Sequence, residues 1–185
     1  DITAASYKQR LYGINDQEVN IQMTLCYNLN LYDILHEADP TIEEPAQMFL
    51  DNNWDYESFE EYCIKVQNAL NTMYGVDSGY YCLSGFGTYY WLNMVNAGGV
   101  RILDTTQLKV SILGSVEAAA AETLRNIFIN GAMDPAMQVD QGNAAWNNEH
   151  ALFNTGAFWF INSSNRWSKD LWGSEEKDAL KSKCK

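Results

Sequence analysis

The chain has 185 residues, which is enough for one domain with its own hydrophobic core and too few for two complete domains. Its net charge of -12 and pI near 4.4 argue against nucleic acid or an anionic membrane as a partner, because both would repel it. No run of about 18 apolar residues occurs, so the sequence predicts no membrane span. We expect an acidic, extracellular type of protein whose targeting segment was removed or lies outside this chain.

The first regular element is a predicted strand in the stretch NIQMTLCYN, where apolar residues alternate with polar ones from Ile21 to Tyr27. A short helix or turn follows, and then an acidic loop that contains Pro40 and Pro45. The next element is a long helix. Asn53 is its predicted cap, apolar residues recur at intervals of three and four, and Gly75 ends it.

Residues 76 to 105 lack helical spacing and are predicted to form loops and short strands around an aromatic cluster. In this stretch Gly98 and Gly99 indicate a turn into a strand from Val100 to Leu103. A second helix is predicted after Ser115 as its cap, with Gly131 as its end.

A third, shorter helix is predicted from Ala144 to Phe153, with Gly156 closing it. The charged tail from Ser168 is expected to be either a helix or a frayed end. Strands and helices mix along the chain, so the predicted class is α/β, with a mixed sheet of about five strands flanked by helices.

The four cysteines, Cys26, Cys63, Cys82 and Cys184, are far apart and form no C-x-x-C pair that would indicate zinc or redox chemistry. Two alternatives stay open for them: buried free thiols, or one disulfide. The composition is also 13% aromatic. Most of these rings must belong to the core, but exposed rings suit a ligand with flat apolar faces.

No catalytic motif emerges from the sequence. His36 and His150 lack a partner at a metal-binding or catalytic spacing, and the adjacent glutamate pairs at 43–44 and 60–61 are typical of solvated faces rather than of an acid and base across a cleft. The stretch SGFGTYYW resembles a phosphate-binding glycine loop only superficially, because aromatic residues stand where a helix would begin. The sequence therefore predicts no enzyme, no cofactor and no metal site.

Three stretches in order, LCYNLNLYD, NNWDYESFEEYCIKVQNAL and ALFNTGAFWFINSSNRW, resemble the extracellular solute-binding proteins of ABC importers, in particular the group of maltose-binding protein. The stretch TYYWLNMVNAGGVRILD is similar to the aromatic loop and double glycine of the same family. The resemblance runs roughly from Leu11 to Trp167. The residues that match the family pattern are Tyr27, Asn28, Trp54, Asp55, Phe59, Phe153, Gly156 and Trp167.

The resemblance implies a fold and a function. Residues 1–185 would form a single α/β lobe of the periplasmic-binding-protein type, the second lobe of a two-lobe receptor. Such a receptor binds a solute between its lobes and delivers it to the permease subunits of an ABC transporter. The resemblance favours a carbohydrate or oligosaccharide as the solute. It also implies an extracellular, cell-surface or periplasmic location, with a lipoprotein anchor in the full-length protein.

Two groups of residues are the candidates for solute contact. By resemblance, the segment after Gly156 faces the cleft; its Asn165 and Trp167 would supply a hydrogen-bonding side chain and a stacking ring. Trp167 packed under the tail is the alternative.

The second group lies in the stretch GTYYW, where Thr88, Tyr89 and Trp91 would line the cleft and Tyr90 would turn into the core. Trp91 packed in the core is the alternative for that residue. Asn20, beside the first predicted strand, is a further candidate.

Other functions stay open at this point. A receptor for a different solute, such as a peptide, a polyamine or a sugar phosphate, is one alternative. A phosphate ligand would require an Arg or Lys beside the aromatic residues, and only Arg166 is close to them. A carbohydrate-acting enzyme or a binding module on another fold is the remaining alternative. A carboxylate pair across a cleft would favour the enzyme.

Overall fold

The computed structural model describes two short strand pairs and most of the chain between residues 24 and 156. The described residues are 6–7, 10–11, 24–100, 102–104, 109–110, 112–138 and 144–156. Of the predicted features, the cleft-facing segment after Gly156, the tail from Ser168 and Cys184 lie outside these residues.

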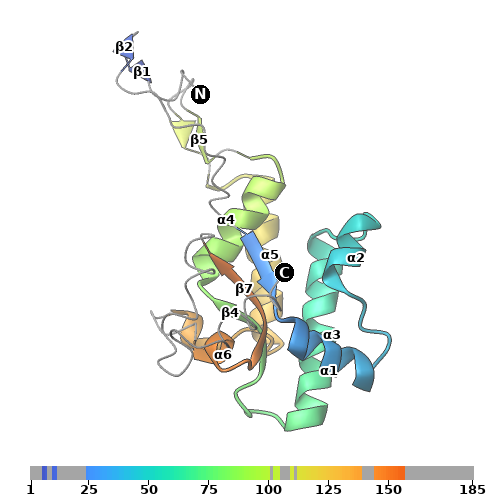
Figure 1. Cartoon of the computed structure of the whole chain (residues 1–185). Helices are drawn as coiled ribbons and strands as arrows, with labels where there is room; N and C mark the ends of the chain where they lie inside the picture. The colour runs from blue at the N-terminus through green and yellow to red at the C-terminus, as the bar shows by residue number, and fades with distance from the viewer. Residues whose placement is uncertain are drawn as a thin grey trace.

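A mixed three-stranded sheet in the order β3–β7–β4 lies at the centre of the described residues (Figure 1). β7 runs antiparallel to β3 and parallel to β4. Two antiparallel pairs, β1 with β2 and β5 with β6, complete the described strands. The strands are β1 (Ser6–Tyr7), β2 (Arg10–Leu11), β3 (Thr24–Tyr27), β4 (Tyr81–Gly85), β5 (Leu103–Asp104), β6 (Lys109–Val110) and β7 (Ala151–Gly156).

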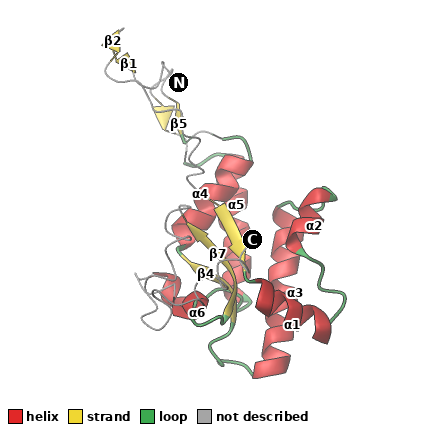
Figure 2. Ribbon diagram, viewed as in Figure 1, coloured by secondary structure: helices red, strands yellow, loops and turns green. Residues whose placement is uncertain are grey.

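Helices flank this sheet, as the α/β prediction requires (Figure 2). They are α1 (Leu29–Ala38), α2 (Pro45–Leu50), α3 (Tyr56–Tyr74), α4 (Gly87–Ala97), α5 (Ser115–Ile129), α6 (Ala144–Asn147) and the 3-10 helix η1 (Pro135–Gln138). Helix α3 packs against α5 and β4, α4 packs against α5, and α6 contacts β4 and β7. The α/β fold class is therefore confirmed.

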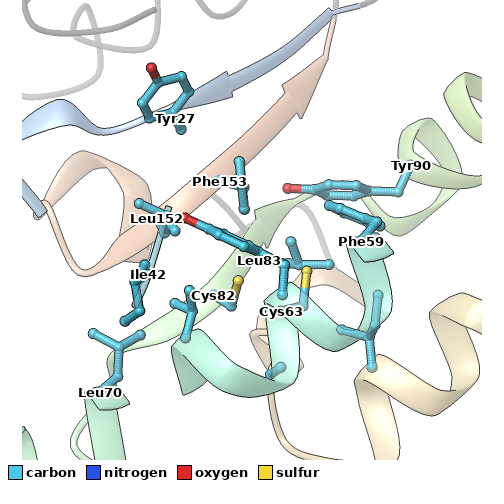
Figure 3. Packing of buried hydrophobic residues seen from close by; sticks show 14 of the residues in the cluster. Tyr27, Ile42, Phe59, Cys63, Leu70, Cys82, Leu83, Tyr90, Leu152 and Phe153 are labelled. Atoms are coloured by element: carbon cyan, nitrogen blue, oxygen red, sulfur yellow. The ribbon is translucent and has the colours of Figure 1, made fainter. Parts of the chain in front are cut away.

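Phe153, in the middle of β7, is the centre of the core and is 0% exposed. Its ring centroid lies 5.9 to 6.4 Å from those of four other aromatic residues, Tyr27, Trp54, Phe59 and Tyr62. Figure 3 shows Phe153 above the buried side chains of β4 and α3. These rings meet edge-on or tilted, which is the favourable arrangement for aromatic pairs.

The long helix α3 confirms the predicted helix and its end, but its cap differs from the prediction. Asp55, and not Asn53, caps the helix: its carboxylate accepts from Ser58 N at 2.9 Å, and Ser58 Oγ accepts from Asp55 N at 2.8 Å. Asn53 N is already bonded to Met48 O at 2.9 Å, inside the turn that ends α2. Gly75 ends the helix at a φ of 93°, a conformation that favours glycine.

Helix α4 was not predicted, and the assignment of residues 76 to 105 to loops and short strands is wrong over this stretch. The consecutive aromatic residues 89–91 have modest helix propensity. Because they are adjacent, they do not show the intervals of three and four by which the buried face of a helix is recognised. Tertiary contacts stabilise the helix instead. Tyr90 and Met94, four positions apart, are 2% and 8% exposed, and Tyr90 Oη donates to Ser84 O at 3.0 Å. The prediction that Tyr90 turns into the core is confirmed.

The turn at the double glycine is present, since Gly99 has a φ of 77°. The strand that follows begins later than predicted, at Leu103 in β5. Helix α5 begins at Ser115, with Gly114 and not Ser115 in the cap position. The Glu117 side chain folds back here: a Cβ on Gly114 would lie 2.3 Å from Glu117 Oε2. Gly131, with a φ of 74°, follows the end of the helix as predicted.

The predicted helix from Ala144 to Phe153 is wrong beyond Asn147. Glu149 adopts a left-handed φ of 60°, which breaks the helix, and the chain enters β7 at Ala151. Residues 151–155 are all buried, because β7 is the central strand and helices cover the sheet. A strand buried on both faces lacks the polar alternation by which strands are recognised.

Candidate functional site

The carboxyl ends of β4 and β7 meet at one edge of the sheet, where Gly85 pairs with Thr155. Helix α4 begins two residues after Gly85. Gly85 has a φ of 103°, and a Cβ at this position would lie 2.3 Å from Asn154 Oδ1, so glycine allows the chain to turn here. Ligand sites of open α/β sheets collect outside such strand ends.

The first turn of α4 places aromatic and hydroxyl groups at this edge. Phe86 and Tyr89 lie edge-on with ring centroids 5.4 Å apart, and both are half-buried. Thr88 between them is exposed. Phe86, in the cap position, supplies no side-chain hydrogen bond to the first backbone N–H groups of the helix. The edge therefore offers partly exposed rings, a hydroxyl and backbone donors, groups that suit a polar ligand with apolar faces.

Two side chains of α4 fix the helix against its neighbours. Asn93 Nδ2 donates to Thr155 Oγ1 at 2.6 Å and so ties α4 to the end of β7. Trp91 Nε1 donates to Glu117 O in α5 at 3.1 Å, and the half-buried Trp91 ring packs against the core. This position agrees with the alternative in which Trp91 packs in the core. Solute contact by Trp91 stays a prediction.

The sequence-predicted site residues thus divide into two groups. Thr88 and Tyr89 lie together at the strand-end edge, and Trp91 lies one turn further along α4 against α5. Asn20, Asn165 and Trp167 lie outside the described residues. Sequence reasoning missed Phe86, Asn93 and Thr155. A strand-turn-helix interpretation of SGFGTYYW would have found Phe86, but only the fold brings Asn93 to Thr155.

The other polar candidates hold the fold together. Tyr27 Oη donates to Glu44 Oε1, and burial together with this bond raises the pKa of Tyr27. Asn126 Nδ2 donates to Glu60 Oε2 at 3.2 Å. His36 Nδ1 lies 2.8 Å from Ile42 O, and the His150 ring stacks on Tyr80 with centroids 4.1 Å apart. Each of these groups therefore has a structural role.

Within the described ranges, no cluster of three or more His, Cys, Asp or Glu side chains is arranged to hold a metal ion. Cys63 and Cys82 are buried free thiols. The described helices include none that is both long and apolar enough to cross a membrane.

No protein-family profile and no curated protein matches this sequence. Solved structures do match its fold. An ABC transporter solute-binding protein from Thermotoga lettingae TMO bound with alpha-D-tagatose superposes with a TM-score of 0.61 at 14% identity, over 94% of this chain. An ABC substrate-binding protein from Listeria monocytogenes in complex with cycloalternan gives a TM-score of 0.55 at 14% identity, over 87% of this chain.

The match is to part of each of those proteins, since this chain spans 42% of the length of the first and 38% of the second. At this identity the likeness concerns the fold. The chain therefore shares the periplasmic-binding-protein-like fold of ABC transporter solute-binding proteins over part of their length.

Proposed function

We propose that this chain is one lobe of a two-lobe solute-binding receptor of an ABC transporter, and that it binds a carbohydrate or oligosaccharide at the strand-end edge of its sheet. The observation that carries the proposal is the position of Thr88 and Tyr89 at the carboxyl end of β4, beside the end of β7. The fold shared with two sugar-bound solute-binding proteins supports it.

The chemistry of the edge suits a sugar. A pyranose has apolar C–H faces and a rim of hydroxyls, so an aromatic ring such as Tyr89 can stack on a face while Thr88 and the first amides of α4 bond to the rim. Asn165 and Trp167 belong to the same proposal, as residues that follow β7 in sequence. Asn20 and Trp91 are the remaining proposed contacts.

The proposed mechanism is closure of two lobes around the solute. A solute shifts the equilibrium toward the closed form only as far as it binds that form better than the open one. The closed form then docks on the permease. This activity would take place at the cell surface or in the periplasm, with the full-length protein held by a lipid anchor. It requires no catalytic residue of this chain.

Calorimetry of the intact protein with a panel of monosaccharides and oligosaccharides tests this proposal. We expect at least one carbohydrate to bind with a dissociation constant in the micromolar range or tighter, which corresponds to about -8 kcal/mol. Reducing-sugar release by the pure protein is measured in the same samples. Release of sugar, or tight binding of a peptide and no binding of any carbohydrate, would contradict the proposal.

Binding by the isolated chain 1–185 tests the proposal that the complete site lies between two lobes. One lobe buries much less of a ligand than a closed cleft, and ligand sites normally bury roughly 70–90% of the ligand surface. We therefore expect the isolated chain to bind the same carbohydrate only in the millimolar range or more weakly, on the order of -4 kcal/mol. A micromolar constant for the isolated chain would show that the site is complete without a second lobe.

A further inference from the structure

A pocket of about 660 Å³ lies between strand β3, the start of α3 and helix α4. Its volume is within the roughly 300–1,000 Å³ that small-molecule sites occupy. Leu25 of β3, Trp54 before α3, and Met94 and Ala97 of α4 are among the residues that line it. Tyr56 Oη donates to Met94 O, and this bond ties the start of α3 to α4. The two walls are therefore held at a fixed separation.

Aromatic rings form the inner part of this pocket. Phe59 and Tyr90 line it while being 6% and 2% exposed, and Figure 3 shows their rings next to each other between α3 and α4. Trp54 is half-buried, and its ring meets Phe59 edge-on with centroids 5.4 Å apart. The pocket thus presents a held indole ring to a ligand, and the face of an indole attracts cations more than other aromatic rings do.

Two carboxylates stand at the rim of the pocket, on Asp55 and Glu57, and both residues are exposed. The residues that line the pocket in the described part of the chain include no Lys, Arg or His. Bonds from Ser58 lower the pKa of Asp55, which favours its charged form. A site with aromatic walls, negative charge at its rim and no cation in its lining discriminates against anions and favours a positively charged ligand.

This pocket is distinct from the proposed sugar-binding edge. Thr88 and Tyr89 do not line it. The two places share a boundary at Asn93, which lines the pocket while its amide donates to Thr155 at the end of β7. A ligand in the pocket would therefore lie beside a sugar at the edge without occupying the same space.

We propose that this pocket is a second small-molecule site, which binds an organic ammonium ion: the apolar body lies against Trp54 and the positive charge faces Asp55 and Glu57. The proposal does not depend on the proposed carbohydrate function.

Three probes of similar size and different charge test the proposal on the intact protein: 2-phenylethylammonium, 2-phenylethanol and phenylacetate. We expect calorimetry or ligand-observed NMR to give the ammonium ion an affinity at least about tenfold higher than the alcohol, and the anion no binding, because the rim is negative. Equal binding of the alcohol, or no binding of the ammonium ion at millimolar concentration, would overturn the proposal.

Two substitutions locate the site. Glu57→Gln should lower the affinity for the ammonium ion about fivefold or more, since it removes one charge from the rim. It should leave the affinity for 2-phenylethanol unchanged. Glu37→Gln, an equal change of charge at an exposed position of α1, is the matched control and should leave the affinity for the ammonium ion unchanged. If the two variants weaken the ammonium ion equally, the attraction comes from the overall negative charge, and the pocket is not the site.

Ala97→Phe should abolish binding of the ammonium ion by filling the pocket, because Ala97 lines the pocket and is itself exposed. Ala121→Phe, at an exposed position of α5, is its control for folding. Carbohydrate affinity, measured in parallel, should be the same in Ala97→Phe as in the wild type. Loss of carbohydrate binding in Ala97→Phe would contradict the separation of the two sites, and retention of ammonium binding in this variant would overturn the second site.

Discussion

Two aromatic groups in this molecule differ in what their rings contact. The first group surrounds Phe153: rings from β3, from α3 and from the loop before it meet this side chain within 6.4 Å. The second group is Phe86 and Tyr89 at the start of α4, where one ring pair at 5.4 Å stands at the edge of the sheet. Phe153 at the centre of the first group is packed on several sides and fully buried, whereas both rings of the second group are half-buried.

This difference separates stability from recognition. A fully buried ring such as Phe153 contributes burial and leaves no face for a ligand, whereas a half-buried ring keeps a face free at a modest cost in stability. Composition alone, with 13% aromatic residues, cannot separate the two groups. The position of a ring relative to the strand ends does so.

The largest expected effect comes from breaking the first group. Phe153→Ala should lower the free energy of unfolding by about 3 to 5 kcal/mol, because it removes a fully buried ring and leaves a cavity among four others. Urea unfolding measures this loss. Phe49→Ala is the control, since Phe49 is 66% exposed and its removal should change stability by less than about 0.5 kcal/mol. Similar losses in the two variants would contradict the central role of Phe153.

The buried side-chain amide of Gln67 joins helix α3 to strand β4 of the sheet. Gln67 in α3 is 3% exposed; its Oε1 accepts from Cys82 N at 2.9 Å, and its Nε2 donates to Tyr80 O at 3.0 Å. Gln67→Met should cost about 1 to 3 kcal/mol of unfolding free energy, because it leaves a buried backbone N–H without its acceptor.

Gln47→Met is the matched control, because Gln47 is exposed and its side chain donates to Asp51 Oδ1 on the surface of α2. Urea midpoints of the two variants are compared with the wild type. An effect of Gln67→Met no larger than that of Gln47→Met would show that the α3–β4 contact depends on apolar packing alone.

A substitution in the second group should affect carbohydrate binding more than stability. Tyr89→Ala should weaken the best carbohydrate ligand of the intact protein by about 1 to 3 kcal/mol, the range of an aromatic anchor in a binding site. Its cost in stability should be smaller than that of Phe153→Ala, because the Tyr89 ring is half-buried. Calorimetry and thermal unfolding of the same samples separate the two quantities.

Tyr90→Phe is the matched variant on the neighbouring residue. It removes a buried hydroxyl that donates to Ser84 O, so it should cost about 1 kcal/mol of stability with no change in carbohydrate affinity. The opposite pattern, with affinity lost at Tyr90 and kept at Tyr89, would reverse the assignment of these two side chains.

A similar contrast in burial explains how much of the structure could be predicted from the sequence. Helix α3 was predictable because its apolar face recurs over five turns and Gly75 marks its end. The strand β3 was predictable because apolar and polar residues alternate up to Tyr27. Local pattern was sufficient where one face of an element meets the core and the other meets solvent.

Local pattern failed where burial is more complete. The residues of β7 are buried on both faces, so their sequence shows no alternation, and the preceding alanines favoured a helix. In α4 the aromatic residues face different neighbours: Tyr90 bonds to Ser84 and Trp91 to Glu117. Such contacts join residues 6 and 26 positions apart, and the second is set by the fold rather than by local spacing. Thr88 and Tyr89 were identified through family resemblance and not through a predicted helix.

Trp91 is half-buried like the second group and packs against the core like the first. Trp91→Phe keeps an aromatic ring and removes the indole N–H that donates to Glu117 O. We expect a loss of about 1 kcal/mol in unfolding free energy, the net value of one hydrogen bond, with little change in carbohydrate affinity. Thermal unfolding and calorimetry measure both. Unchanged stability with an affinity loss of more than about tenfold, or 1.4 kcal/mol, would instead place this ring on the solute, as the family resemblance predicts.

The smallest expected effect on stability comes from the charge of one buried carboxyl group, that of Asp134. Asp134, beside the β4 bridge at Met133, is 6% exposed, and burial raises its pKa above the ordinary value. A carboxyl group with a higher pKa in the folded state binds its proton more tightly there, so its contribution to stability is present below the unfolded pKa and is lost as pH rises through the folded pKa. Asp134→Asn preserves an oxygen that can accept from Ala136 N and cannot ionise. We therefore expect this variant to equal the wild type at low pH and to become the more stable of the two as pH rises toward 7.

The surface residue Asp39 provides the comparison of opposite sign. Bonds from the Thr41 hydroxyl and backbone N–H lower the pKa of Asp39, so its contribution is present above the unfolded pKa and is lost as pH falls through the folded pKa. Asp39→Asn should thus be less stable than the wild type near pH 7 and should equal it in acid. Urea midpoints between pH 3 and 7 should give the two variants opposite slopes relative to the wild type. Parallel slopes would mean that burial at Asp134 is compensated by a favourable contact of its carboxylate, and the packed region would then tolerate charge as readily as the surface does.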